Sequence, residues 1–243
     1  MNKEAAKIFS RIILSDKTIR IKLLGDSITH GAGGTGFNED GEHVAGPYYR
    51  NTKGHCWANL LKEYLESRYD CAVINNGCAG TGIDFTLENF DALVDAEDDI
   101  VLCTICTNDR YRYFTPEPDL DAQTHMRNLY TKLSTLYQKL REMNKQVIFA
   151  VNIPVGAANE SLNGESGYRR LLHMPDIHDL FVKLSLDHGF PLIDLYTLFQ
   201  EYCESNKISL DSLLADGIHP NDAGYEVMYR LLLKELGIAR YAI

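Results

Sequence analysis

Short apolar runs recur along the chain and alternate with longer segments in which apolar residues repeat at helical spacing. Five of the runs are brief and rich in Val, Ile or Leu, a composition typical of strands buried on both faces of a parallel sheet. We therefore predict five strands, at Ile19–Leu24, Ala72–Asn75, Ile100–Ile105, Val147–Val151 and Pro191–Leu195.

Four other segments place apolar residues three or four positions apart, so that they share one stripe of a helix. The predicted helices cover Trp57–Leu65, Asp121–Met143, Ile177–His188 and Asn221–Leu236. This alternation of strands and helices favours an α/β fold, a three-layer α/β/α sandwich around a parallel five-stranded sheet, formed as one domain over residues 1–243. Ligands of such folds bind where the strands end, so functional residues are expected directly after each strand.

Two long segments, Gly31–Gly54 and Pro154–Pro175, do not follow the alternation. Both are polar and rich in glycine, and long loops in a compact domain are usually functional or mobile. Each leaves the carboxyl end of a predicted strand. We therefore predict two loops that border a substrate pocket.

The net charge of the chain disfavours some classes of binding partner. With 24 basic and 34 acidic residues the formal net charge is −10, which disfavours phosphate backbones and anionic membranes, so no nucleic-acid partner is expected. No stretch approaches the roughly 20 apolar residues of a membrane helix. The apolar run Ile8–Leu14 is interrupted by polar side chains and lacks the features of an export signal. We expect a cytoplasmic protein without integral membrane association; its oligomeric state stays open.

The six cysteines are expected to be reduced thiols, because a core of this size does not need disulfides. Cys103 and Cys106 form a C-x-x-C pair, but a zinc site usually needs a second such pair or paired histidines, and the sequence offers neither. These cysteines are instead predicted to be small apolar residues at the end of a buried strand. Lone histidines such as His173 and His178 indicate no metal either, and no cofactor is expected.

The first predicted strand is followed by Gly25-Asp26-Ser27, which places a serine at the carboxyl edge of the sheet. Serine is a weak nucleophile until a base takes its proton. Asp216 and His219 stand three residues apart before the last helix, where a turn can fold the carboxylate under the imidazole ring and fix its tautomer. The alternative is that Asp216 and Asp222 are helix-capping residues and that His219 is a surface turn residue.

Two further strands end in residues suited to acyl transfer. Asn108 follows the third predicted strand and can donate a side-chain hydrogen bond to an oxyanion, and Gly80 follows the second and can offer its backbone N–H. Alone, each is also an ordinary turn residue. Together with Ser27, Asp216 and His219 they converge on one edge of the predicted sheet, and this convergence predicts a catalytic site.

At these positions the chain resembles the SGNH hydrolases, the GDSL-type esterases and lipases. The similar blocks are Gly25-Asp26-Ser27, Gly80, Cys106-Thr107-Asn108-Asp109 and Asp216-Gly217-Ile218-His219-Pro220. The resemblance implies a flavodoxin-like sandwich. It also implies an oxyanion hole formed by the N–H groups of Ser27 and Gly80 and the side chain of Asn108.

One position departs from the family pattern, since the third block usually reads G-x-N-D and Cys106 replaces the glycine. If the backbone there needs a positive φ, a cysteine strains the turn and displaces Asn108. The other possibility is that a small side chain is tolerated.

The reaction implied is a two-step ester hydrolysis that needs neither a metal nor an organic cofactor. His219 takes the proton of Ser27, an acyl-enzyme forms, and water activated by His219 then releases the acid. Activity is expected to rise with pH as His219 loses its proton.

The substrate is less defined, because the family's chemistry covers lipids, thioesters and acetylated sugars. The two long polar segments lack the exposed apolar run of a lipid-binding lid, which favours a short acyl group on a polar or carbohydrate alcohol. The alternatives are a lipase, a thioesterase or an acyltransferase with the same triad, and a catalytically silent binding module on the same fold.

Two other sequence patterns are weaker evidence for a functional site. The segment Gly31–Gly36 matches G-x-G-x-x-G, but it lies well past the strand and no helix opens over it, which argues against a dinucleotide site. The residues Arg110–Phe114 either line the substrate site or cover the edge of the sheet.

Overall fold

The computed structural model describes residues 2–110, 121–161 and 170–238. Within these residues a parallel five-stranded sheet forms the centre, in the order β4-β1-β5-β6-β7. The strands are β1 (Ile19–Gly25), β4 (Cys71–Gly77), β5 (Ile100–Thr104), β6 (Gln146–Val151) and β7 (Leu192–Asp194). The prediction of a five-stranded parallel sheet is confirmed, and each observed strand overlaps its predicted range.

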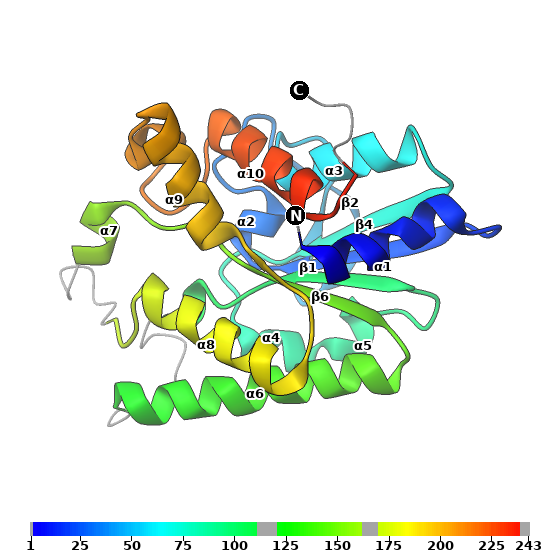
Figure 1. Ribbon diagram of the computed structural model, residues 1–243, viewed down its shortest axis with the longest axis horizontal. Helices are drawn as coiled ribbons and strands as arrows, with labels where there is room; N and C mark the ends of the chain where they lie inside the picture. The colour runs from blue at the N-terminus through cyan, green and yellow to red at the C-terminus, as the bar shows by residue number, and fades with distance from the viewer. Residues whose placement is uncertain (1, 111–120, 162–169, 239–243) are drawn as a thin grey trace.

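Helices cover both faces of this sheet, as the two layers in Figure 1 show. One layer contains α1 (Lys3–Leu14), α3 (Trp57–Glu66), α9 (Leu195–Asn206) and α10 (Asp222–Glu235). The other contains α4 (Ile83–Glu88), α5 (Phe90–Leu93), α6 (Ala122–Glu142) and α8 (Met174–His188). Alternate residues of β1 enter two separate apolar cores, Ile21 and Leu23 on one face and Leu24 on the other. The predicted α/β/α sandwich is therefore confirmed.

All four predicted helices form, and side-chain caps mark the starts of two of them, α6 and α10. Helix α6 begins after Asp121, whose carboxylate accepts a hydrogen bond from Thr124 N at 2.8 Å, and it buries Leu129, Leu133 and Leu136. Helix α10 is capped by Asn221, which accepts from Gly224 N at 3.1 Å. Among the described residues, no helix has the length and apolar character needed to cross a membrane.

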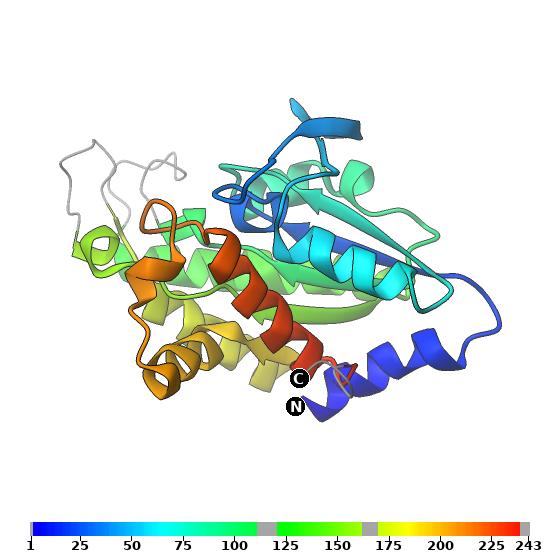
Figure 2. The same cartoon turned by 90° about the horizontal axis from the view of Figure 1, so that it is seen from above.

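The expectation that Gly31–Gly54 is a loop is wrong in part. This segment contains an antiparallel hairpin of β2 (Glu39–Ala45) and β3 (Tyr48–Asn51), which stands out from the body in Figure 2. Most of β2 is exposed and polar, so it lacks the period-two apolar signal from which a strand is predicted.

The expectation for Pro154–Pro175 is also wrong in part. Helix α7 (Ala157–Ser161) lies inside this segment and α8 already begins at Met174; residues 162–169 are outside the described residues. Helices α1 and α9 were not predicted either. Helix α9 follows β7 directly, so that Asp194 is both the last residue of the strand and the cap of the helix, accepting from Thr197 N at 3.0 Å.

The carboxyl ends of the strands form the edge that carries the candidate chemistry. Counting only the sheet strands along the chain, their spatial order is 2-1-3-4-5, so the order reverses between β1 and β5. Ligands of doubly wound sheets bind at this switch point. Helix α2 (Ser27–His30) follows β1 there, and the short 3-10 helix η1 (Asn108–Arg110) follows β5.

Candidate active site

Ser27 is the first residue of α2, and only Asp26 stands between it and the end of β1 at Gly25. The preceding residue, Asp26, caps this helix, because its Oδ1 accepts a hydrogen bond from Ile28 N at 3.0 Å. The cap fixes the direction of the short helix. As a result the serine is presented at the sheet edge, with 6% of its surface exposed.

The turn before α10 brings an aspartate and a histidine together. Asp216 Oδ1 accepts from the backbone N of Ile218 at 3.0 Å and of His219 at 2.8 Å. Its other oxygen, Oδ2, lies 2.7 Å from His219 Nδ1. A carboxylate is only an acceptor, so Nδ1 carries the proton and Nε2 is left to accept. His219 Nε2 lies 2.8 Å from Ser27 Oγ.

The structure therefore brings together all three residues of the predicted triad, although Ser27 and His219 are 192 positions apart. Partial burial acts to raise the pKa of Asp216. The hydrogen bonds that it accepts from the backbone and ring of His219 and from Ile218 outweigh burial, so its pKa lies below the ordinary value. The carboxylate is thus ionised and able to stabilise a protonated His219.

The glycine-rich segment that follows α2 packs behind this turn. A Cβ on Gly33 would lie 2.9 Å from His219 Cβ and 2.5 Å from Pro220 O, so no side chain fits there. Thr35 donates from its N and its Oγ1 to the two oxygens of Asp222, both at 2.7 Å. The segment with the dinucleotide-like pattern therefore supports the histidine turn.

Gly80 and Asn108 lie on neighbouring loops, after β4 and β5. Gly80 has a φ of +72°, and a Cβ placed on it would meet no atom within 4 Å. Asn108 Nδ2 donates to Thr81 O, the residue after Gly80, at 2.8 Å. An amide NH₂ has two hydrogens, so Asn108 keeps a second one for another acceptor while the first joins the two loops.

Cys106 has a φ of +82°, in the left-handed region that favours glycine. The glycine of the family pattern is thus explained by backbone conformation, and Cys106 adopts the strained form. Its thiol donates a hydrogen bond to the carboxyl group of Asp109. Both oxygens of that carboxyl group also accept from Ile83 N, each at 3.1 Å. Asn108 keeps its bond to Thr81 despite the substitution.

Asp109 is buried, and this burial raises its pKa to about 7, although the hydrogen bonds from Ile83 and Cys106 oppose the shift. Its two oxygens cap the start of α4. The residue thereby joins the loop after β5 to the helix that follows Gly80.

A buried polar network beneath Ser27 was not predicted. Asp26 Oδ2 accepts from Thr107 N at 3.3 Å and from Asn152 Nδ2 at 3.2 Å, and Asn152 also donates to Thr107 Oγ1 at 2.7 Å. Burial raises the pKa of Asp26, against the hydrogen bonds that it accepts. The position of Asn152 directly after the fourth strand was the signal available in the sequence.

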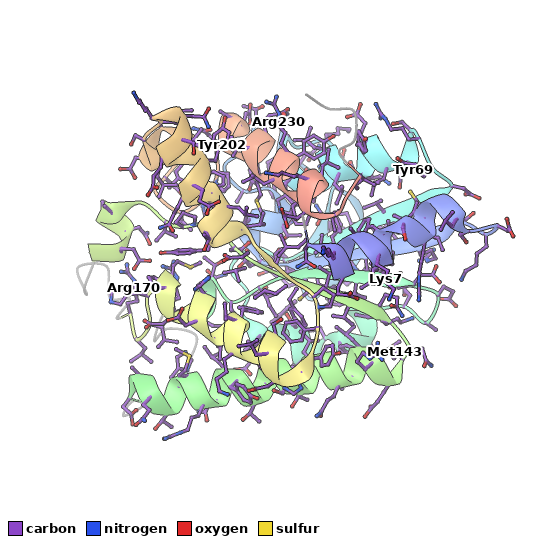
Figure 3. All side chains as sticks on the ribbon, in the orientation of Figure 1. Lys7, Tyr69, Met143, Arg170, Tyr202 and Arg230 are labelled. Carbon is purple, nitrogen blue, oxygen red and sulfur yellow. The ribbon has the colours of Figure 1, made fainter. Side chains whose placement is uncertain are left out.

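The remaining candidates have structural partners. Arg110 is fully buried, donates to Thr107 O at 2.8 Å and pairs with Glu160 at 3.2 Å, so it does not line an open site. Residues 111–114 lie outside the described residues. His173 contacts Glu160 at 2.7 Å, and Arg170, labelled in Figure 3, pairs with the same carboxylate. His178 lies between two aspartates.

The six cysteines are all free and buried. A cavity of about 710 Å³ lies at the opposite edge of the sheet, where β1, β5 and β6 begin. Met143, labelled in Figure 3, is among the residues that line it. The sequence-predicted site residues are not, so this cavity is separate from the candidate chemistry.

The sequence matches the model of the GDSL-like Lipase/Acylhydrolase family over residues 23–227. None of the curated proteins matches the chain. Among solved structures, LAE5, an alpha/beta hydrolase enzyme from the metagenome of Lake Arreo, Spain, is 21% identical with a TM-score of 0.69. That match covers 93% of this chain and 98% of LAE5.

Axe2, an acetylxylan esterase from Geobacillus stearothermophilus, is 18% identical with a TM-score of 0.66, and the match covers 91% of this chain and 95% of Axe2. Variants of Axe2 in which a serine, an aspartate or a histidine is replaced are described as catalytic mutants of that esterase. These likenesses show that the chain shares its fold with both proteins.

Proposed function

Because the chain belongs to the GDSL-like lipase/acylhydrolase family over residues 23–227, it is a carboxylic ester hydrolase, and we propose that Ser27 is its nucleophile. The resemblance predicted from the sequence blocks is confirmed by this match. The observation that carries the proposal is the contact of 2.8 Å between Ser27 Oγ and His219 Nε2, continued by the contact of 2.7 Å between His219 Nδ1 and Asp216.

In acylation, His219 Nε2 takes the proton of Ser27 as Oγ attacks the ester carbonyl. The tetrahedral intermediate collapses, His219 gives the proton to the leaving alcohol, and the acyl group stays on Ser27. In deacylation, His219 takes a proton from water, the water oxygen attacks the acyl carbon, and the acid leaves as Ser27 regains its proton. Asp216 holds the ring and stabilises its positive charge in both steps.

The negative charge on the carbonyl oxygen is proposed to be stabilised by Ser27 N–H, Gly80 N–H and Asn108 Nδ2. Two features support this set. Asn108 has one amide hydrogen beyond the one bonded to Thr81 O, and no atom lies within 4 Å of the position that a Cβ on Gly80 would take. Donors fixed before the reaction are effective because they need no reorganisation as charge develops.

The substrate is proposed to be a short acyl ester, acetyl-like, of a polar or carbohydrate alcohol. The hairpin beside the Gly80 loop exposes three charged residues, Glu39, Asp40 and Glu42, and one large aromatic residue, Tyr49. We take this mostly charged surface to suit a hydrated alcohol better than a lipid chain. Axe2, which shares the fold, is an acetylxylan esterase, and this agrees with the proposed class.

The experiment is hydrolysis of p-nitrophenyl esters from acetate to decanoate by the wild type and by Ser27→Ala. Loss of the nucleophile is expected to lower kcat by about 10⁴ or more. The ratio kcat/KM is expected to be largest for acetate and to fall with chain length. Ser27→Ala as active as the wild type would exclude the nucleophile, and a maximum at decanoate would exclude the short acyl group.

A further inference from the structure

The residue before Gly80 is held on both of its backbone groups. Tyr48 OH donates to Ala79 O at 2.6 Å. Ala79 N donates to Nδ1 of His30 at 3.3 Å. Tyr48 comes from β3 of the hairpin and His30 from the last turn of the serine helix α2, so two separate elements fix one residue of the Gly80 loop.

The bond from Tyr48 acts directly on the proposed oxyanion donor. The carbonyl of Ala79 and the N–H of Gly80 belong to one planar trans peptide unit and point in opposite directions. A hydroxyl that fixes the carbonyl therefore also fixes the direction of the N–H. Hydrogen bonds in a chain also polarise one another, so the same contact strengthens Gly80 N–H as a donor.

Both side chains are themselves held in place. The ring of Tyr48 packs edge-on against Phe85 of α4, with ring centroids 5.5 Å apart. Burial raises the pKa of Tyr48, so the phenol keeps the proton that it donates. A rigid support of this kind is what a preorganised donor requires.

His30 is 1% exposed, and its Nε2 lies 3.0 Å from Tyr49 O. Since Nδ1 accepts from Ala79 N, Nε2 carries the proton and donates to Tyr49 O. Burial lowers the pKa of His30, although the contact with Tyr49 and the charge of Glu39 act in the other direction, and a neutral ring is the form that can accept from Ala79.

We propose that Tyr48, assisted by His30, is a positioning residue that aims the Gly80 N–H at the oxyanion through the Ala79–Gly80 peptide. The inference rests on the proposed function and assigns part of its oxyanion hole to the β2–β3 hairpin.

The test is Tyr48→Phe, which removes only the hydroxyl. Removing an oxyanion donor outright lowers kcat by about 10²–10³, so a donor that is present but poorly aimed is expected to lower it by about tenfold or somewhat more. KM for p-nitrophenyl acetate should stay within about twofold, because the contact acts on the transition state. The affinity for 1-butaneboronic acid, whose serine adduct is tetrahedral, should fall together with kcat.

The matched control is Tyr64→Phe. Tyr64 OH also donates to a backbone carbonyl, that of Ile238, at 3.2 Å, but from α3 and away from Ser27. This variant loses the same hydroxyl and is expected to keep the wild-type kcat.

A second pair of variants tests His30. The Oδ1 of asparagine can take the place of Nδ1, and the Nε2 of glutamine the place of the other ring nitrogen. His30→Asn therefore keeps an acceptor for Ala79 N, and His30→Gln keeps the donor to Tyr49 O. We expect kcat to be lower in His30→Gln than in His30→Asn, and this order decides the question should Tyr48→Phe not fold.

An unchanged kcat in Tyr48→Phe, or a change in KM alone, would overturn the inference, and so would a fall in kcat with unchanged boronic acid affinity. The proposed function is judged separately by Ser27→Ala. If that variant is inactive while Tyr48→Phe is unimpaired, only the positioning role fails. If Ser27→Ala remains active, the proposed function fails and the inference with it.

Discussion

Two aspartates near Ser27 differ in almost every physical respect. The side chain of Asp216 is 54% exposed, lies on a turn and has a lowered pKa. Asp26 is 1% exposed, lies between the ends of β1, β5 and β6, and burial raises its pKa. Nearness to the nucleophile therefore does not by itself define the role of a carboxylate. Asp216 contacts the ring of His219 and is ionised, so it can stabilise a charge on that ring. Asp26 is buried and accepts from residues that follow β5 and β6, so we assign it a scaffold role.

The largest effect that bears on this comparison is expected from His219→Ala. Without a base, Ser27 keeps its proton, and kcat for p-nitrophenyl acetate should fall by about 10⁴ or more. Steady-state kinetics measure the fall, and a thermal melt serves as the control, since the exposed turn should tolerate the change. A residual rate within tenfold of the wild type would show that another group acts as base.

Asp216→Asn should follow, with kcat lower by about 10² to 10⁴, because an amide cannot stabilise the charged ring and can select the wrong tautomer. The unfolding midpoint in urea is expected to change little. If Asp216→Asn had wild-type activity, Asp216 would have only a structural role, as proposed for Asp26.

Asp26→Asn is expected to do the opposite. Its amide NH₂ would face Thr107 N or Asn152 Nδ2, leaving a buried donor unsatisfied, and the free energy of unfolding should fall by about 1–3 kcal/mol. Urea denaturation gives this value. The cost should be clearly larger than that of Asp216→Asn, and a smaller cost would count against the scaffold role.

Asp109 is a further buried carboxyl group, and its contribution to stability should depend on pH. Its pKa rises from an ordinary 3.8 to about 7 in the folded protein, so the folded state holds this proton more tightly than the unfolded chain does. Its contribution to stability is therefore present at low pH and is lost as pH rises from 4 to 7. Relative to Asp109→Asn, which does not titrate, the wild type should lose up to about 1.4 kcal/mol per pH unit between pH 5 and 7. A constant difference would mean that the carboxyl titrates normally.

The smallest effect is expected at Thr35→Val, which removes the hydroxyl bond to Asp222 but keeps the backbone bond. An exposed hydrogen bond to a charged group contributes on the order of 1 kcal/mol, and kcat should fall by less than tenfold. A fall in kcat as large as that of Asp216→Asn would contradict this expectation. It would show that the position of the histidine turn depends on the hydroxyl of Thr35.

Much of the fold was predictable because local patterns agree with the tertiary structure. The five buried strands and the helices α3, α6, α8 and α10 have apolar periods that match their environments. The β2–β3 hairpin was missed because β2 is mostly solvent-exposed and polar. Helix α9 was missed because no turn separates it from β7. That residues 1–243 form one domain stays a prediction.

The candidate site also contains residues that the sequence predicts and contacts that it does not. Ser27, Asp216 and His219 could be proposed from sequence because serine after a strand and Asp-x-x-His before a helix are local signals. The contacts of Asn152 with Asp26 and of Tyr48 with Ala79 join residues that are 126 and 31 positions apart. No local pattern encodes those pairs. Cys106 lies between these two cases. The family pattern marked the position as unusual, but only the structure shows the positive φ that explains why glycine is usual there.

The separation of 192 residues between Ser27 and His219 also has a consequence for synthesis and refolding. The nucleophile leaves the ribosome long before its base, so a nascent chain carries a complete β1–α2 unit that cannot yet attack an ester. Contacts between distant parts of a chain form late, because loop closure must precede them. The return of esterase activity after dilution from denaturant should therefore report the docking of the final turn and α10, while far-UV circular dichroism reports the earlier formation of the helices.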